Sequence, residues 1–237
     1  MKYLENRQDN LVPVIIAGIV SIVIAQIPYA NLILYPFKMF VTYIHEASHG
    51  LMAIITGGTL NRFEMSLDAS GLAYTTGGIR LLIVSAGYLG SAFWGSLLFI
   101  AAYKKSYEKI VLGSLSAFLL LFTVLFARNI TSFITGLILA ASIYLIKKIK
   151  YNSFISVFLA FLAIQTCFNS LNDIFSLLFL SNLNIVTDAH IISRELTGGL
   201  MPPIVFAVIW GLISLTFFVF AFKVCFKKEK RPKLIDL

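Results

Sequence analysis

The sequence is poor in charged residues and in cysteine. Only 13% of its 237 residues are charged, whereas 59% are hydrophobic and the mean hydropathy is +0.89. A soluble domain of this length needs a larger polar surface than this composition supplies. The two cysteines, Cys167 and Cys225, stand in separate apolar segments without metal-ligand spacing. We therefore predict buried thiols, with neither a disulfide framework nor a redox motif.

The charge that is present does not favour nucleic acid as a partner. The formal net charge is +8, but the lysines form short clusters beside hydrophobic segments, at 104–109, 147–150 and 223–233. Such clusters anchor and orient membrane helices. We therefore expect the lipid bilayer as a partner of this chain, and no nucleic acid.

Apolar stretches of membrane-spanning length recur along the whole chain. A helix needs about 20 predominantly apolar residues to cross a bilayer, and seven segments approach that length. They are 11–35, 37–56, 79–103, 110–127, 131–146, 154–180 and 203–222. Pro202 and Pro203 suit the start of the last helix, and Gly57-Gly58 suits the end of the second. The sequence predicts an all-α polytopic membrane protein in one membrane-embedded domain, 1–237, with a basic tail at 223–237.

Residues 59–78 differ from the rest of the chain. Hydrophobic and polar residues alternate at 63–67 and again at 72–74, and a turn signal lies between them at 68–71. This pattern predicts a short β-hairpin directly after the second helix. Two interpretations stay open. The hairpin is either a plain loop outside the bilayer, or a sheet edge that holds an extended substrate by strand addition.

Two of the three histidines, His45 and His49, stand four residues apart in the second apolar segment. Four residues are slightly more than one helical turn, so both imidazoles project from one face toward one ion. Glu46 lies beside the first histidine and can act as a general base. Zinc suits such a site, because two imidazoles and one further protein ligand leave a position for water. Chance placement gives this motif in about one sequence in a thousand. We therefore predict His45 and His49 as zinc ligands and Glu46 as the catalytic base.

A third ligand, often a carboxylate, has to come from another part of the chain. Segment 154–180 contains a polar stripe on one face of an otherwise apolar helix. The stripe consists of Gln165, Asn169, Asn172, Asp173 and Ser176. We predict Asp173 as the third ligand because an unpaired aspartate is costly there, and Asn169 and Asn172 as hydrogen-bond donors to the ligands or to the substrate backbone. Interhelical hydrogen bonding in a packing stripe is the alternative.

Asp188 is the second candidate for the third ligand, followed by Asp68. Asp188 lies in the polar stretch 181–201, which a solvated loop also explains. Elsewhere, segment 79–103 carries small residues every four positions at Gly87, Ser91 and Gly95. Small residues at this spacing let helix backbones approach closely in membranes. We expect this helix to press against the one that carries the histidines.

These residues together resemble a known family, the site-2-protease-like intramembrane metalloproteases, and most closely its compact bacterial and plant branch. The matching features are His45-Glu46-Ala47-Ser48-His49-Gly50, Thr56-Gly57-Gly58, Leu67-Asp68-Ala69-Ser70-Gly71, Ala86-Gly87-Tyr88-Leu89-Gly90, Asn172-Asp173 and Thr187-Asp188-Ala189. Their order and spacing cover about three quarters of the chain. The resemblance implies zinc, peptide-bond hydrolysis in or near the membrane, and a carboxylate ligand from a later helix, at Asp173. The family usually presents that aspartate as Leu-Asp-Gly or Pro-Asp-Gly, whereas here it is Asn172-Asp173-Ile174.

The expected function is that of an intramembrane zinc endopeptidase. It would hydrolyse peptide bonds of membrane-embedded or membrane-adjacent protein segments, with Glu46 as general base for a zinc-activated water. The alternative is a non-proteolytic membrane protein that keeps a structural zinc site and binds or chaperones a partner. An ion or solute carrier ranks last, because it leaves the spacing of the histidines unexplained.

Partners and location follow from the same observations. The chain shows no inserted sensing domain, so we expect a membrane protein substrate to be selected by the membrane core or by an accessory membrane protein. Richness in Ile, Phe, Lys and Asn is typical of a low-GC bacterium, which predicts a multi-pass protein of the bacterial cell membrane. Its orientation stays open. Cytoplasmic lysine clusters would leave the hairpin and the N-terminus outside, whereas the resemblance implies a hairpin that faces the cytoplasm.

Overall fold

The computed structural model describes residues 2–25, 27, 29–180 and 187–226, with side chains throughout except at 2–10, 25, 31 and 169–180. Helices make up most of it, and one two-stranded hairpin interrupts them. The helices are α1 (Lys2–Ala25), α2 (Ala30–Ile55), α3 (Arg80–Tyr103), η1 (Lys105–Tyr107), α4 (Glu108–Phe126), α5 (Ile130–Lys148), α6 (Asn152–Leu180), α7 (Asp188–Thr197) and α8 (Pro203–Phe226). The mostly helical fold with a short hairpin is confirmed.

Four helical segments of the described chain are long and apolar enough to cross a membrane. They are α3, η1 together with α4, α5 and α8. Within the residues whose side chains are described, α1 and α6 contribute the shorter apolar stretches Leu11–Ile24 and Asn152–Phe168. The fold therefore supports an integral membrane protein, but the count of seven crossing helices is not confirmed.

The predicted boundary between the first two helices is wrong. α1 ends at Ala25 and α2 begins at Ala30, so residues 30–35, predicted as the end of the first helix, belong to the second. Pro36, where the prediction placed the break, lies inside α2. A proline inside a helix removes one backbone hydrogen bond, and here this loss does not end the helix. The chain turns at Tyr29 instead, whose φ of 68° lies in the left-handed region.

The stretch 181–201, predicted as a polar loop, contains the short helix α7. Thr187 precedes the helix in an extended conformation, and Gly198 ends it with a φ of 61°. Its buried residues Ala189, Ile192 and Ser193 follow helical spacing. These start and stop signals are present in the sequence. The prediction missed them because the helix is only 10 residues long and carries few apolar residues.

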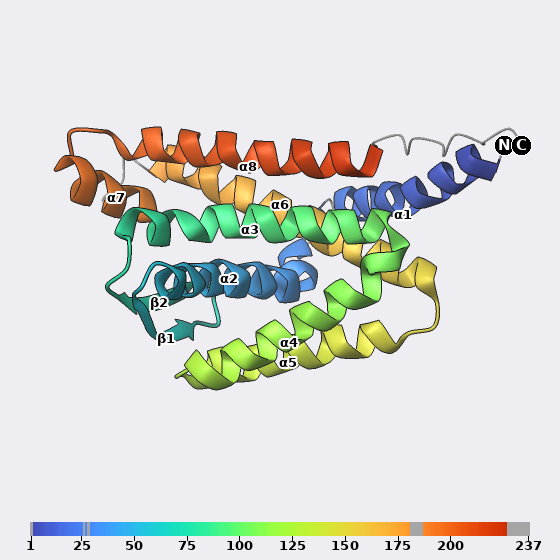
Figure 1. Cartoon of the computed structure of the whole chain (residues 1–237), viewed down its shortest axis with the longest axis horizontal. Helices are drawn as coiled ribbons and strands as arrows, with labels where there is room; N and C mark the ends of the chain where they lie inside the picture. Colours follow the sequence, from blue (N-terminus) through green and yellow to red (C-terminus); the bar gives the residue numbers. More distant parts are fainter. Residues whose placement is uncertain (1, 26, 28, 181–186, 227–237) are drawn as a thin grey trace, which may run out of the picture.

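The helix α3 runs through the middle of the molecule and packs against α2, α6 and α8 (Figure 1). α1 and α2 follow one another in the same direction, and α3 then returns. As a result the first turn of α1 and the last turn of α8 lie at one end of the molecule, on the right of Figure 1. The lysine-bearing ends of α5 and α8 lie at that end too. The hairpin and α7 lie at the opposite end.

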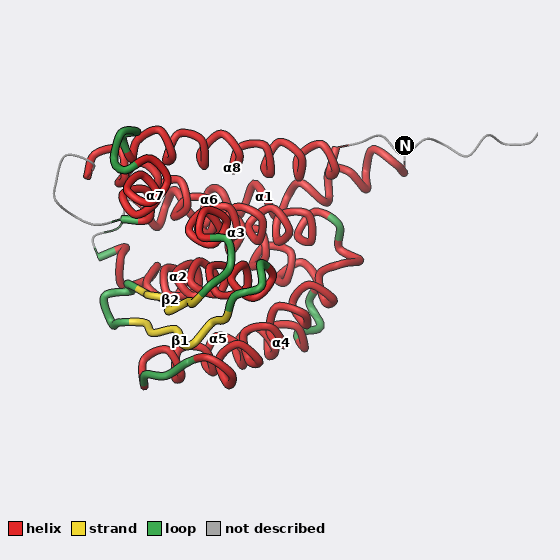
Figure 2. Tube along the Cα trace, turned by 60° about the vertical axis from the view of Figure 1, so that its left-hand side comes forward, coloured by secondary structure: helices red, strands yellow, loops and turns green. Residues whose placement is uncertain are grey.

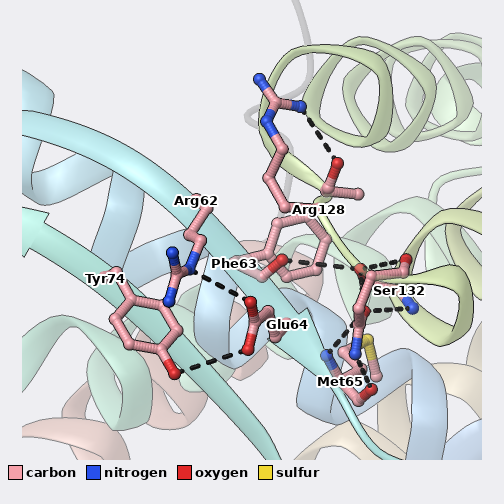
Figure 3. A network of polar contacts seen from close by, with 9 residues as sticks. Arg62, Phe63, Glu64, Met65, Tyr74, Arg128 and Ser132 are labelled. Carbon is pink, nitrogen blue, oxygen red and sulfur yellow. Dashed lines mark hydrogen bonds and ion pairs between the residues drawn. The ribbon is translucent and has the colours of Figure 1, made fainter.

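The hairpin packs between α2 and the loop that joins α4 to α5. Its strands β1 (Thr59–Met65) and β2 (Gly71–Thr76) pair antiparallel. The outer edge of β1 is occupied, because the carbonyl of Phe63 accepts from the N–H of Arg128 at 3.4 Å and the side chain of Asn129 bonds both backbone groups of Met65 (Figure 3). β2 therefore lies between β1 and α2, with its outer edge toward α2 (Figure 2).

Candidate metal centre

The helix α2 presents both predicted histidines on one face. The ring centroids of His45 and His49 lie 4.7 Å apart, and His49 is 93% buried, with 7% of its surface exposed. Oδ2 of Asp188, the first residue of α7, lies 3.5 Å from Nε2 of each histidine. Two helices far apart in sequence thus bring two imidazoles and one carboxylate together.

One hydrogen bond fixes the orientation of His49. Its Nδ1 lies 2.7 Å from the carbonyl oxygen of Ile83 in α3. Since a carbonyl can only accept, Nδ1 carries a proton and donates it to Ile83, which leaves Nε2 as the ring nitrogen that faces Asp188. Metal-binding histidines usually donate their other ring N–H in this way.

Gly87 of α3 keeps open the space between these three side chains. A Cβ placed on Gly87 would lie 2.3 Å from Nε2 of His45 and 2.4 Å from Nε2 of His49. Metal ions bind imidazole and carboxylate at about 2.0–2.2 Å, which separates two ligands of a tetrahedral ion by about 3.3–3.6 Å. The distances of 3.5 Å from Asp188 to both nitrogens are close to that separation. The donor set and the space that Gly87 leaves therefore fit a metal ion.

Asp188 stands at the N-terminus of α7, where a negative charge interacts favourably with the helix dipole. Burial raises the pKa of its carboxyl, but the neighbouring imidazoles of His45 and His49 outweigh burial and hold that pKa below its usual range. The carboxylate is therefore ionised at neutral pH, as a metal ligand has to be.

Glu46 joins the two histidines in one group whose ligand atoms all lie within 4.8 Å of one another. Its side chain is buried, and its carboxylate accepts the backbone N–H of Ala73 in β2. Gly71, also in β2, comes so close that a Cβ there would lie 2.6 Å from Cγ of Glu46. The outer edge of β2 therefore runs directly beside Glu46.

A cavity of about 310 Å³ opens next to this group. It is lined by one face of α2 from Lys38 to Glu46, by the hairpin turn at 68–71 and by Tyr88 of α3. Two hydrogen bonds hold the turn against α2: the hydroxyl of Tyr35 donates to the carbonyl of Leu67 at 2.6 Å, and that of Thr42 donates to Ala69 at 2.8 Å. The cavity therefore reaches His45 and Glu46.

The other predicted site residues either do not join the metal group or lie outside the described side chains. Asp68 accepts from the backbone N–H of Ser70 at 2.9 Å and from its hydroxyl at 2.7 Å. These two bonds lower the pKa of Asp68 and occupy it within the turn. The side chains of Asn169, Asn172 and Asp173 in α6 lie outside the part of the chain whose side chains the structure describes.

The fold and the site together define an integral membrane protein with a histidine-glutamate-histidine group of the metallopeptidase type. The family model described as Peptidase M50B-like matches residues 15–221. The chain belongs to this family of metallopeptidases, and the resemblance inferred from the sequence is confirmed. No curated protein and no solved structure matches the chain.

Two residues at the site carry no chemical group that a motif search would select. Gly87 supplies only space, and Ala73 supplies only a backbone N–H. The spacing of Gly87, Ser91 and Gly95 did indicate close helix packing. It did not indicate which glycine faces the histidines, because that depends on the rotation of α3 about its axis.

Proposed function

We propose that this protein is an intramembrane zinc endopeptidase that cleaves membrane-embedded or membrane-adjacent protein segments. One observation carries the proposal. His45, His49 and Asp188 converge around the space left by Gly87, and Glu46 lies beside them at the edge of a cavity. Zinc suits a set of two imidazoles and one carboxylate. When bound, it would polarise the scissile carbonyl and lower the pKa of the attacking water.

The residues of the chain divide the remaining work. Glu46 takes a proton from the attacking water and passes it to the nitrogen of the leaving amine, as a positioned general base does. The N–H of Ala73 and the close approach of Gly71 hold the Glu46 carboxylate in place. Burial of His49 and Glu46 limits the access of bulk water to these groups.

We propose the outer edge of β2 as the place where an extended substrate lies. The outer edge of β1 is already occupied by residues 127–132. The outer edge of β2 faces α2 and Glu46, and a peptide that adds there has to displace the contact between the N–H of Ala73 and Glu46. A peptide that adds to this edge would use its main chain for affinity, independently of most of its side chains. This interpretation extends the strand-addition alternative that the sequence left open.

We propose Asp188 as the third ligand in preference to Asp173. The support is its distance of 3.5 Å from both imidazole nitrogens and its position at a helix N-terminus. Asp173 remains the competing candidate, with Asn169 and Asn172 as its companions on α6.

Metal analysis of the purified protein tests the site itself. We expect one equivalent of zinc in the wild type and a loss of this zinc in the double variant His45→Ala, His49→Ala. His190→Ala is the matched control, since that histidine bonds Thr187 at 2.8 Å and does not belong to the group. Equal zinc content in the double variant and in the wild type would disprove the proposal.

The variant Glu46→Gln separates proteolysis from a non-proteolytic role. It should keep its zinc, while cleavage should fall by about 10²–10⁴-fold because the general base is lost. A comparison of membrane proteomes from cells with wild-type protein and with Glu46→Gln identifies substrates, which accumulate uncleaved in the variant. If the cellular function survives the change while zinc is retained, the protein binds or chaperones its partner instead.

We further propose that the lysine-bearing end faces the cytoplasm of a bacterial cell, as the positive-inside rule predicts. The ends of α5 and α8 that carry lysines lie together, and the hairpin and α7 lie at the other end. Reporter fusions after Gly78 and after Leu237 test this orientation. A cytoplasmic signal from the fusion after Gly78 would reverse it.

A further inference from the structure

A second apolar cluster, separate from the main core, lies next to the metal centre. It joins α3, α7 and α8 through Val84, Tyr88, Ala189, Ile192, Phe206, Ala207 and Trp210. Two of these three helices contribute directly to the site, since α7 begins with Asp188 and α3 carries Gly87. The third, α8, contributes no residue to the ligand set described above.

Tyr88 stands between a ligand and the tryptophan of α8. Its ring meets that of His45 edge-on, with centroids 4.8 Å apart and an interplanar angle of 86°. On its other side, Tyr88 stacks on Trp210 at 5.1 Å with an angle of 14°. Aromatic pairs with such geometry are more stable than the area that they bury alone would make them.

Trp210 is itself fixed in orientation. It is 2% exposed, and its indole N–H donates to the hydroxyl of Ser85 at 2.9 Å. A buried indole that is stacked on one side and hydrogen-bonded at its edge has little freedom to rotate. Trp210 therefore presents a fixed surface to Tyr88.

The same cluster seats the helix that carries the carboxylate. Ala189 and Ile192 are 0% and 1% exposed, and they pack in the cluster one and four residues after Asp188. A displacement of this packing would move Asp188 relative to the imidazoles. The two histidines therefore differ in how they are held: His49 by its hydrogen bond to Ile83, and His45 by an aromatic contact.

We infer that Tyr88 and Trp210 are positioning residues of the metal centre, through which α8 orients His45 and seats Asp188. This inference rests on the metal site proposed above. Trp210 supplies no ligand itself, and its effect passes through Tyr88 and α7. Its removal is expected to weaken and distort the site without removing any ligand.

The experiment uses the full-length protein in detergent micelles, loaded with Zn²⁺ or Co²⁺ alone. Trp210→Leu is compared with Trp94→Leu. This control removes the other tryptophan, which packs on Phe118 at the margin of the main core. Zinc affinity is measured by competition with a chelator, ligand geometry by the visible absorption of bound Co²⁺, and stability by thermal unfolding of the metal-free protein.

We expect Trp210→Leu to lower zinc affinity by about 10–100-fold, the range found when groups that orient metal ligands are removed. It should also change the Co²⁺ spectrum. Trp210→Phe should have nearly the zinc affinity and the Co²⁺ spectrum of the wild type, because a phenyl ring still stacks on Tyr88. Trp94→Leu should lower stability and leave both metal readouts unchanged. Equal affinities and spectra for Trp210→Leu and Trp94→Leu would overturn the inference.

Two further measurements keep the test decisive. If Trp210→Leu does not fold, Ser85→Ala removes the hydrogen bond of the indole and should give a smaller change of the same sign in the Co²⁺ spectrum. An unchanged spectrum there would also overturn the inference. If the wild type binds neither metal through His45 and His49, the proposed site fails as well. If the wild type binds both metals and the Trp210 variants have the same affinity and spectrum, only the positioning role fails.

Discussion

The helices α3 and α5 have similar hydropathy but different surroundings. The most apolar stretches of the two helices are nearly equal in hydropathy, yet 61% of this stretch is buried in α3 and only 22% in α5. α3 buries small and polar residues, such as Ser85, Ser91 and Ser96, against neighbouring helices. α5 exposes large aliphatic residues, such as Ile134 and Ile138. Hydropathy alone therefore does not distinguish a central helix from one that faces lipid.

The difference in burial between α3 and α5 explains which helices can carry residues of a reactive site. Charged and polar side chains inside a membrane are costly unless they face a metal, a cavity or one another. Only a helix that is enclosed by other helices can line such a space. α3 does so with Gly87 and Tyr88, whereas the glycine of α5, Gly136, faces Thr123 and Tyr43 in a tightly packed interior.

The strongest test of this comparison is the pair Gly87→Ala and Gly136→Ala. The added methyl group in Gly87→Ala would occupy the space between the imidazoles, so we expect zinc binding to be abolished. In Gly136→Ala the methyl group would lie 2.0 Å from Oγ1 of Thr123. Overpacking of this kind costs about 1–3 kcal/mol of stability, but zinc should remain bound.

Both variants are measured for zinc content and for thermal unfolding. Gly18→Ala serves as a control for the substitution itself, because nothing lies within 4 Å of a Cβ at Gly18. Should Gly87→Ala retain one equivalent of zinc with wild-type affinity, the space beside Gly87 is not the metal position.

The next largest effect distinguishes the two aspartates. Asp188→Asn should lower zinc affinity by more than about 100-fold, since the loss of a direct ligand exceeds the 10–100-fold loss seen for groups that only orient one. Asp173→Asn should change zinc affinity less if Asp188 is the ligand. Chelator competition on both variants measures the difference. A larger loss in Asp173→Asn would return the third ligand to α6, as the sequence alone favoured.

Part of the candidate site could be predicted from the sequence. His45, Glu46 and His49 could be predicted because their spacing acts within one helix, where geometry follows from the helical repeat. The hairpin at 59–78 could be predicted for the same local reason. The proximity of Asp188 to the histidines could not, because it depends on how α7 packs against α3 and α8. Asp188 and the two histidines stand about 140 positions apart in sequence, and no local pattern encodes their proximity.

The first helix boundary failed for a related reason. Apolar residues continue from α1 into α2, so hydropathy gives no signal at the turn, and Pro36 suggested a break where the helix continues. The two helices then run in the same direction, which removes one crossing from the count. The first turn of α1 and the last turn of α8 therefore lie at the same end of the molecule, whereas alternation over seven crossings had placed the N-terminus opposite the basic tail.

The smallest predicted effect lies at the interface of α2 with α4. The hydroxyl of Tyr43 bonds Oγ1 of Thr123 at 2.7 Å and donates to the carbonyl of Leu119 at 3.1 Å, while its ring packs on Phe63. Tyr43→Phe keeps the ring and should lower the free energy of unfolding by about 1 kcal/mol. Zinc affinity should be unchanged, although Tyr43 is only two residues from His45, because its side chain points away from α3 toward α4. A double-mutant cycle with Thr123→Val isolates the bond. A fall in zinc affinity in Tyr43→Phe would mean that the interface of α2 with α4 is coupled to the metal centre. The central helix α3 and the peripheral helices would then differ less in function than their burial suggests.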